Sequence, residues 1–299
     1  MAILLFVMYA FFGLSFIFGS TVMQYASPIF FIGMRMIVSG LIMLGYLKVR
    51  HKSCKIKRGD LPSFFVLSIV HILIPYLCEF WALQYISASK VSLIWSLSPF
   101  VTAIFAWFMF RERMTIMKLV GLLIGFFGFI PIVLHEGAKE STLSSLFKIS
   151  TADFALVIAV ISAAFAWSSF KKLSQKGYSS LFINGWAMLF GGLGSMTLSP
   201  FFEVWNPVPV SNWPITLGCL FALILTGGII GYNLYGYLLK HYTVTLLAFA
   251  GGMVPFWTAM FQWLILGQTV SYAFVVSVFI ISLGLYVFYK EELRQGYIK

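Results

Sequence analysis

Six residues at positions 98–103, Ser-Pro-Phe-Val-Thr-Ala, return at positions 254–259 as Val-Pro-Phe-Trp-Thr-Ala, which is a shift of 156 positions. The same shift superposes four further pairs: Trp107 on Trp263, Tyr76 on Tyr232, Tyr85 on His241 and Gly128 on Gly284. The chain therefore contains an internal repeat, and we expect its fold to be built from two related halves.

Apolar residues make up 61% of the 299 residues and charged residues only 10%. Soluble domains carry roughly 45–50% apolar and about 25% charged residues, and a helix needs about 20 mostly apolar residues to cross a bilayer. Ten such runs are present, at residues 2–23, 28–47, 62–84, 87–109, 116–134, 154–174, 180–200, 214–238, 243–266 and 271–289. The sequence thus predicts an all-α integral membrane protein with ten transmembrane helices.

The repeat divides these ten runs into five and five. We expect a first five-helix repeat at residues 1–134, an outer connecting loop at 135–153, and a second repeat with a C-terminal tail at 154–299. Because five is an odd number, the second repeat has to enter the membrane in the opposite orientation. Inverted repeats of this kind are the architecture of many secondary transporters, so the pattern favours transport by alternating access.

The basic residues predict which side of the membrane each loop faces. With the N-terminus inside, sixteen of the twenty Lys and Arg residues face the cytoplasm: Lys48, Arg50, Lys52, Lys55, Lys57, Arg58, Arg111, Arg113, Lys118, Lys171, Lys172, Lys176, Lys240, Lys290, Arg294 and Lys299. Only Lys90, Lys139 and Lys148 face outward. This asymmetry predicts that both termini are cytoplasmic. It also explains the net charge of +11 as membrane topology, and we expect no nucleic-acid partner.

Neither the cysteines nor the glycines indicate a cofactor. Cys54, Cys78 and Cys219 are odd in number and have no short spacing, so we expect no disulfide framework and no metal site. The glycine-rich segment 227–231 lies within an apolar run, without the strand and loop of a nucleotide-binding site. We predict no catalytic residues, no cofactor and no ATP-binding motif.

Two ionisable residues, Arg35 and Glu79, lie well inside apolar runs, where a charge costs on the order of 3 kcal/mol or more. Each is seven residues from the predicted outer end of its helix, roughly 10 Å deep. Three interpretations remain open. The two residues form a structural ion pair, they bind the two ends of a zwitterionic substrate, or Glu79 is a proton-coupling acid.

Aromatic and amide residues near these charges are further substrate-binding candidates. Aromatic rings can stack on a base or hold a cation, and buried amides require hydrogen-bond partners. Each one taken singly is also consistent with ordinary packing, as is His71 in the third run. The candidates are Tyr76, Trp81, Trp95, Tyr232, Asn233, Trp257 and Gln262.

Pro99 and Pro255 occupy matching positions in the fourth and ninth runs. A proline in the middle of a helix removes a backbone hydrogen bond and bends the helix. We predict that these two residues are paired hinges in the middle of their helices, with fixed kinks as the alternative.

The motifs of the first repeat resemble the drug/metabolite transporter superfamily, in particular its EamA-type ten-helix carriers. The resemblance covers nearly the whole chain and is weaker in the second repeat, where Gln268, Ser277 and Ile281 replace a usual glutamate and two glycines. Arg35 also matches an arginine common in the second helix of such repeats. The motifs are Trp81-Ala82-Leu83-Gln84-Tyr85-Ile86-Ser87-Ala88-Ser89, Leu97-Ser98-Pro99-Phe100-Val101-Thr102-Ala103, Phe110-Arg111-Glu112-Arg113-Met114-Thr115, and Gly121, Gly125 and Gly128.

The resemblance implies a central cavity between the two repeats and a small-molecule substrate. Together with the Arg35 and Glu79 charges it favours a secondary active transporter of an amino acid or an amino-acid-derived compound, coupled to a proton or a counter-substrate. S-adenosylmethionine is one candidate, because family members in intracellular bacteria carry it. We expect a multi-pass protein of a bacterial inner membrane. The alternative is an intramembrane enzyme or a non-transporting scaffold.

Overall fold

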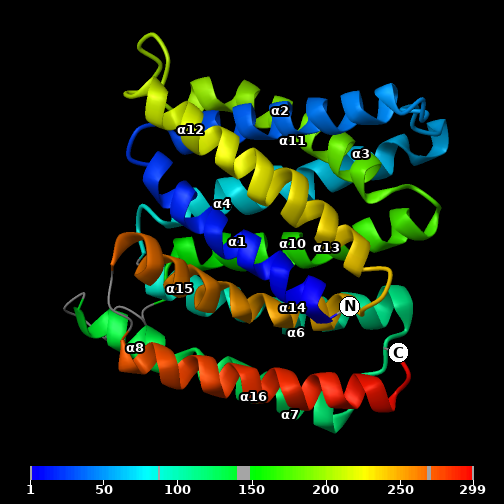
Figure 1. Ribbon diagram of the computed structural model, residues 1–299, viewed down its shortest axis with the longest axis vertical. Helices are drawn as coiled ribbons and strands as arrows, with labels where there is room; N and C mark the ends of the chain where they lie inside the picture. Colours follow the sequence, from blue (N-terminus) through cyan, green and yellow to red (C-terminus); the bar gives the residue numbers. More distant parts are fainter. Residues whose placement is uncertain (1, 87, 140–148, 268–270, 298–299) are drawn as a thin grey trace. The chain divides into compact units, whose positions relative to one another are not determined.

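A computed structural model describes residues 2–86, 88–139, 149–267 and 271–297, and in these ranges the chain is helical apart from loops and one isolated bridge between Ala26 and Val210 (Figure 1). Within the described residues, nine helical spans are long and apolar enough to cross a membrane. They correspond to nine of the ten predicted runs. The fifth run contains a shorter apolar helix, Ile116–Ile132. Residues 140–148 of the predicted outer loop lie outside the described residues.

The described helices divide between the two halves of the sequence. The first repeat contains α1 (Ala2–Val22), α2 (Pro28–Val49), η1 (Arg58–Asp60), α3 (Leu61–Ser68), η2 (Ile69–Leu73), α4 (Ile74–Ala82), α5 (Ala88–Trp95), α6 (Ser98–Phe110), α7 (Ile116–Gly128) and α8 (Ile130–Lys139). The second contains α10 (Thr151–Gln175), α11 (Ser180–Phe202), α12 (Trp213–Leu223), η3 (Ile224–Gly231), α13 (Tyr232–Leu238), α14 (Val244–Ala250), η4 (Gly251–Met253), α15 (Val254–Leu266) and α16 (Tyr272–Arg294).

The chain packs as two compact units, and each takes segments from both halves of the sequence. Unit 1 comprises Met1–Leu77 and Ser169–Tyr237, and unit 2 comprises Cys78–Ser168 and Leu238–Lys299. In each unit, helices from the first half of the sequence therefore pack against helices from the second half.

In unit 1 the central pair is α2 with α11, which lie side by side and run antiparallel (Figure 1). A Cβ atom added at Gly33 would lie 2.9 Å from the backbone nitrogen of Met196, and one added at Gly40 would lie 2.8 Å from that of Leu189. Glycine is therefore required for the two backbones to approach this closely. Under the shift of 156 positions, Met196 corresponds to Gly40 and Leu189 corresponds to Gly33. The contacts are therefore reciprocal, because each of the two glycines contacts the counterpart of the other.

In unit 2 the corresponding pair is α7 with α16, which also run antiparallel (Figure 1). A Cβ atom added at Gly128 would lie 2.9 Å from the backbone nitrogen of Ile281, and one added at Gly284 would lie 2.6 Å from that of Gly125. These contacts are reciprocal as well, since Gly284 corresponds to Gly128 and Ile281 to Gly125. Glycine at these positions therefore allows the backbones of α7 and α16 to approach closely.

Local backbone structure repeats at the same shift. Both α6 and α15 end in a left-handed residue, Arg111 with φ 55° and Gly267 with φ 65°. The next helices begin after matched hydroxyl caps, Thr115 and Ser271, whose side chains accept from the amide three residues on. The internal repeat seen in the sequence is therefore also a repeat of helix ends.

The two candidate hinge prolines do not lie in the middle of helices as predicted. Pro99 is in the first turn of α6, which follows a break after Trp95, and Pro255 is in the first turn of α15, after the short turn η4. The first turn of a helix has free N–H groups, so a proline there removes no hydrogen bond. Each span is thus interrupted before its proline rather than bent at it.

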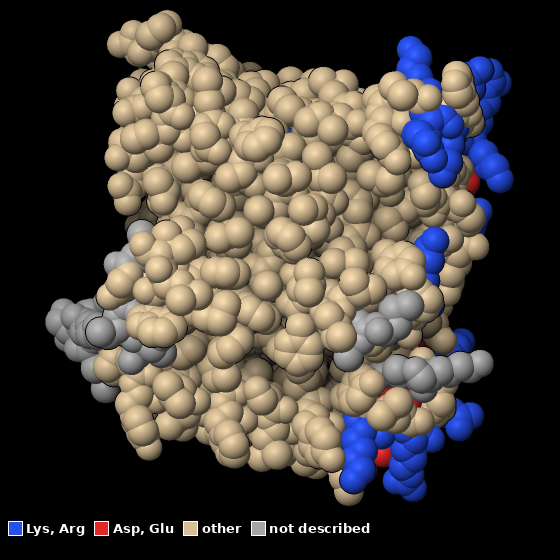
Figure 2. All heavy atoms as spheres, viewed as in Figure 1, with Lys and Arg blue, Asp and Glu red and all other residues tan. Residues whose placement is uncertain are grey.

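Basic side chains gather at one end of each unit (Figure 2). In unit 1 they lie where α2 ends and α3 begins, and in unit 2 they lie around the C-terminal end of α16. Two lysines predicted to lie in loops, Lys90 and Lys118, are instead buried in helices. Lys90 on α5 forms an ion pair with Asp153 at 2.8 Å, and Lys118 lies in α7.

Candidate functional site

The main candidate site in unit 1 is the seam between α2 and the η3–α13 segment. Arg35, Ser39 and Met43 are spaced by four residues on α2, so they lie on one face of the helix. They meet, in the same order along the seam, Gly227, Gly228 and Asn233. The seam therefore places a charge, a hydroxyl and an amide along one helix–helix contact.

Arg35 lies against a glycine. Its Nη2 atom is 3.2 Å from the position that a Cβ atom at Gly227 would occupy. The Ser15 hydroxyl oxygen is 3.1 Å from the same position and is hydrogen-bonded to the Thr226 hydroxyl at 2.9 Å. The Nε atom of Arg35 is buried and has no hydrogen-bond partner among the described residues. Such a donor normally finds an acceptor, so its position is suited to a ligand or to water.

Ser39 follows one helical turn after Arg35. Ser39 is fully buried, and its hydroxyl has no hydrogen-bond partner within the described part of the chain. The hydroxyl oxygen is 2.7 Å from the position of a Cβ atom at Gly228. Sequence reasoning missed Ser39, because a serine in an apolar helix becomes informative only once the face that it occupies is known.

The seam continues as a pair of amides. The Asn184 amide nitrogen on α11 donates to the Asn233 side-chain oxygen at 3.1 Å, and the Asn233 amide nitrogen donates to the Ile229 carbonyl at 2.8 Å. Asn184 is fully buried, and its own side-chain oxygen has no donor among the described residues. Asn233 was predicted as a substrate-binding candidate, whereas Asn184 was not. Both are amides within an apolar run, so the same signal could have identified Asn184.

Tyr76 and Tyr232 come together in unit 1. Their hydroxyl oxygens are 3.1 Å apart, and the rings of His71 and Tyr232 meet edge to face with centroids 5.3 Å apart. His71 lies on η2 and Tyr232 directly follows η3. Both segments are π-helical, a wider form of helix that frequently occurs at functional sites.

The other predicted residues lie in unit 2. Glu79 and Trp81 are on α4, and Trp81 is 41% exposed with its ring against Tyr85. Trp95 packs on the cluster formed by Ala82, Val91, Ile94, Ala152, Leu156 and Val160. Since Arg35 and Glu79 belong to different units, their pairing stays a prediction.

Trp257 and Gln262 lie on α15. Trp257 stacks on Phe261, with ring centroids 6.1 Å apart, and its buried indole N–H has no acceptor among the described residues. Gln262 is half-buried. The orphan indole makes Trp257 the better placed of the two for a polar ligand.

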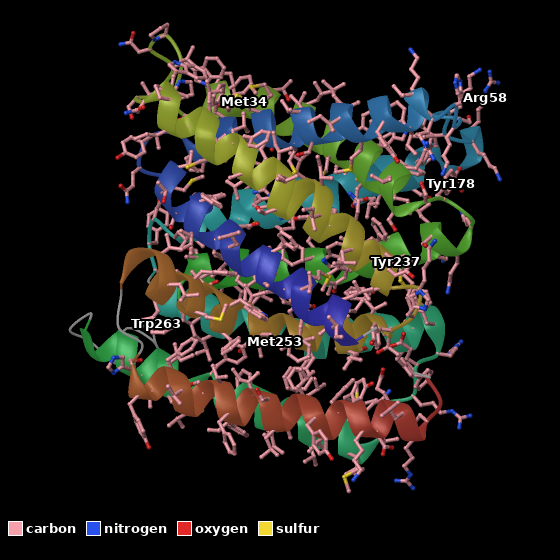
Figure 3. The ribbon with its side chains drawn as sticks, viewed as in Figure 1. Met34, Arg58, Tyr178, Tyr237, Met253 and Trp263 are labelled. Atoms are coloured by element: carbon pink, nitrogen blue, oxygen red, sulfur yellow. The ribbon has the colours of Figure 1, made fainter. Side chains whose placement is uncertain are left out.

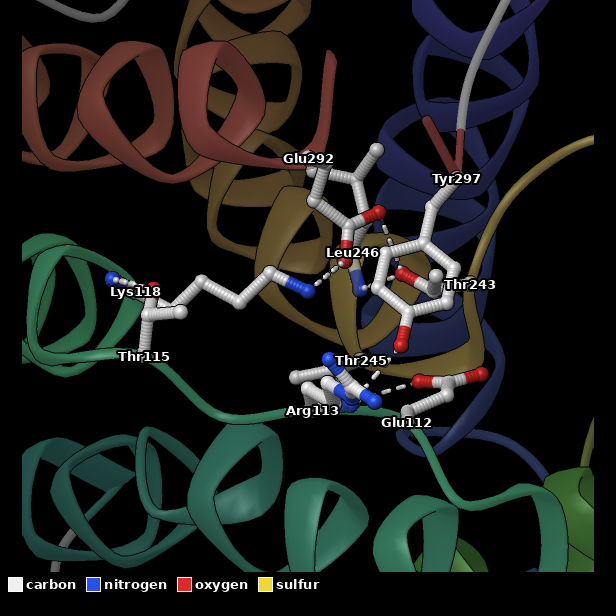
Figure 4. A network of polar contacts seen from close by, with 9 residues as sticks. All are labelled: Glu112, Arg113, Thr115, Lys118, Thr243, Thr245, Leu246, Glu292 and Tyr297. Carbon is white, nitrogen blue, oxygen red and sulfur yellow. Dashed lines mark hydrogen bonds and ion pairs between the residues drawn. The ribbon is translucent and has the colours of Figure 1, made fainter. Parts of the chain in front are cut away.

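A buried ionic network that the sequence did not reveal joins α7, α14 and α16 in unit 2 (Figure 4). The Lys118 ammonium is 2.6 Å from the Glu292 carboxylate, and both side chains are buried. Glu292 also accepts from the Thr243 hydroxyl at 2.7 Å, and the Tyr297 ring lies 4.5 Å from the ammonium. The network fixes the start of α14 against the α7–α16 pair.

A second polar cluster lies at the basic end of unit 1, near the labelled Arg58 and Tyr178 (Figure 3). The Tyr178 hydroxyl donates to Asp60 at 2.9 Å, and the Lys176 ammonium donates to the same carboxylate. Burial and the bond to Asp60 raise the pKa of Tyr178 above its usual range. The bonds of Tyr178 and Lys176 to Asp60 attach the start of α3 to the segment just before α11.

The comparisons with known proteins cover nearly the whole chain. The model of the EamA-like transporter family matches residues 1–134 and 150–290. The S-adenosylmethionine/S-adenosylhomocysteine transporter of Chlamydia muridarum is 31% identical over 95% of this chain and 90% of its own length. The uncharacterized transporter YoaV of Bacillus subtilis is 22% identical over 87% of this chain and 86% of its own.

A solved structure, described only as the crystal structure of a protein, shares the fold. It superposes with a TM-score of 0.78 at 16% identity, and the match covers 98% of this chain and 97% of that one.

Proposed function

Because the chain belongs to the EamA-like transporter family and is a multi-pass membrane protein, we propose that it carries S-adenosylmethionine across the membrane and exchanges it for S-adenosylhomocysteine. The observation that carries the proposal is the 31% identity, over 95% of the chain, to a transporter named for these two compounds. The two compounds differ by one methyl group and one charge, so one site can accept both. S-adenosylhomocysteine is then the counter-substrate.

Alternating access is supported by the reciprocal packing of the repeats. In α2 with α11, Gly33 contacts the counterpart of Gly40, and Gly40 contacts the counterpart of Gly33. The same exchange holds for α7 with α16, and the helices of both pairs run antiparallel. A two-fold axis that crosses the helices produces such contacts. An axis in the membrane plane is what inverted repeats require.

The charged groups suit the amino-acid end of the substrate. Arg35 binds the carboxylate, since a guanidinium presents parallel donors to a planar anion. Glu79 binds the ammonium, and the aromatic candidates stack on the adenine or contact the sulfonium. Tyr76 and Tyr232 are favoured because their hydroxyls meet beside the His71 ring. Trp257 and Trp95 are favoured because the buried indole N–H of each has no acceptor among the described residues.

The direction of insertion follows from the charges. By the asymmetry of the basic residues along the sequence, the loop after α2 and the C-terminal end of α16 face the cytoplasm, with both termini on that side, in the inner membrane of a bacterium. The chain is a secondary carrier, and gradients of substrate and counter-substrate drive its cycle.

The test is flux in proteoliposomes that hold the purified protein. Labelled S-adenosylmethionine enters vesicles preloaded with S-adenosylhomocysteine and enters empty vesicles much more slowly. Arg35→Ala and Glu79→Ala each lower this flux at least tenfold. Arg294→Ala, which removes an arginine that is 79% exposed, leaves it unchanged. If a broad panel of metabolites, S-adenosylmethionine included, does not cross, the chain is a scaffold or an enzyme instead.

A further inference from the structure

We propose that Ser39 and the glycines Gly227 and Gly228 complete, with Arg35, the subsite for the substrate carboxylate. This inference rests on the proposed transport of S-adenosylmethionine and deepens it. Arg35 supplies the charge, Ser39 supplies a neutral donor one helical turn away, and the two glycines leave the space in which both donors lie.

The first argument is the type of the unpartnered atoms. The Nε of Arg35 and the hydroxyl of Ser39 are both buried, and both lack a hydrogen-bond partner among the residues described. Both are donors, and an unpaired buried donor is unfavourable. An anion with two oxygens supplies the missing acceptors for both at once. A cation would leave the Arg35 donor unpaired and add a repulsive charge.

The second argument is position. Arg35 and Ser39 are four residues apart on α2, so their side chains lie one above the other on the same face. Both approach consecutive residues of η3, Arg35 at Gly227 and Ser39 at Gly228. The two donors therefore point at one short stretch of a single segment.

The third argument is the space that the glycines leave. A Cβ atom at Gly227 would lie 3.2 Å from Arg35 Nη2, and one at Gly228 would lie 2.7 Å from the Ser39 hydroxyl oxygen. Any other residue at position 228 pushes the hydroxyl away. At position 227 the guanidinium has to give way by a few tenths of an ångström. The glycines thus set the position of the donors and do not bind the ligand themselves.

The π-helical form of η3 provides a way in. Ser39 is fully buried here, so a carboxylate reaches it only when α2 and η3 separate slightly. A π-helical turn is wider than an α-helical turn, and its hydrogen bonds can shift by one residue. The seam is therefore a contact that opens without unfolding the span.

The experiment compares two ligands that differ only in the carboxylate, S-adenosylmethionine and its decarboxylated form. Both are titrated against the full-length protein in detergent, and their dissociation constants are measured for wild type, Ser39→Ala and Gly228→Ala. We expect each substitution to weaken S-adenosylmethionine about tenfold, the typical effect of losing a hydrogen bond to a charged group. The decarboxylated ligand changes by less than twofold.

Ser68→Ala is the matched control. Ser68 is also a buried serine of unit 1, but its hydroxyl already donates to the Phe64 carbonyl at 2.7 Å. We expect this variant to bind both ligands as wild type does. Ser39→Ala removes an atom without a partner, so the variant keeps its fold, which its melting temperature verifies.

The outcomes separate the two proposals. Suppose that wild type binds S-adenosylmethionine, but Ser39→Ala weakens the binding of both ligands equally or weakens the binding of neither. Ser39 then has no role at the carboxylate, and this inference is wrong while the proposed function stands. If wild type does not bind S-adenosylmethionine at all, the proposed function and the inference fall together.

Discussion

The hydroxyls of Tyr76 and Tyr232 are hydrogen-bonded at 3.1 Å, and the two residues are 156 positions apart, so each tyrosine contacts its own counterpart in the other repeat. A residue meets its counterpart only where a two-fold axis passes between them. The bond therefore marks a point on the axis proposed for unit 1.

The tyrosine pair predicts a specific pattern of energetic coupling. Tyr76→Phe and Tyr232→Phe each remove the same bond, so each should destabilise unit 1 by about 1 kcal/mol. The double variant should lose less than the sum of the two, by roughly the energy of one bond. Thermal unfolding of all four proteins in one detergent measures this. Full additivity would show that the bond contributes nothing.

The Lys118–Glu292 pair predicts a large effect of removing one partner. Glu292→Gln leaves a buried ammonium without its counter-charge and should destabilise the protein by about 3–5 kcal/mol. Lys118→Met combined with Glu292→Leu should recover most of that loss, because no charge then stays buried. Urea unfolding followed by tryptophan fluorescence reports both.

A neighbouring ion pair supplies the comparison for this result. Glu291 and Arg294 lie on the same helix with 3.6 Å between their charged atoms, and Arg294 is 79% exposed. Its removal in Arg294→Ala should change stability by less than about 1 kcal/mol. Equal effects of Glu292→Gln and Arg294→Ala would contradict the burial argument.

Two glycines of α2 predict opposite results. Gly40→Ala places a Cβ atom 2.7 Å from the Gly185 carbonyl oxygen and should force α2 and α11 apart, which lowers the melting temperature by several degrees. Gly45→Ala meets nothing within 4 Å and should leave the melting temperature unchanged or raise it. A similar loss in both variants would mean that helix propensity, rather than packing, is being measured.

The broken spans predict a kinetic effect for the two prolines. Pro99→Ala and Pro255→Ala allow the helices on each side of the break to join, because alanine favours a continuous helix. If the breaks are hinges, the exchange rate falls several-fold while the dissociation constant for S-adenosylmethionine stays the same. Pro28→Ala, which follows a loop, should change neither. Unchanged exchange in the first two variants would identify the breaks as fixed features.

The sequence predicts the nine long spans found in the described residues, because insertion into a bilayer depends on the local run of apolar residues. Asn233 is a candidate from the sequence because an amide is conspicuous in an apolar run, and Tyr76 and Tyr232 correspond through the shift of 156 positions. The sequence misses Ser39 and Lys118. A serine in an apolar helix becomes informative only when the face of the helix that it occupies is known. A lysine at the end of an apolar run is interpreted as a loop residue, because the sequence does not show that its partner, 174 positions away, lies beside it.

The π-helical form of η3 and the breaks before Pro99 and Pro255 are also invisible in the sequence. Residues 224–231 are as apolar as an ordinary span, and a proline inside a long run has the same pattern whether it bends a helix or begins one. Both outcomes depend on which neighbouring helices satisfy the backbone, and that is a property of packing.

The Lys118–Glu292 ion pair of unit 2 has no equivalent at the matched positions of the repeat, because the residue that corresponds to Lys118 is Phe274. In a carrier built from two equivalent repeats, the two end states would have equal free energy and equal population. An ion pair that joins Lys118 of the first repeat to Glu292 of the second, without an equivalent pair at the matched positions, would make the end states unequal, and each 1.4 kcal/mol of that inequality is a tenfold difference in occupancy. Such a carrier has different apparent affinities on its two sides, although the gradient alone still sets the direction of net transport.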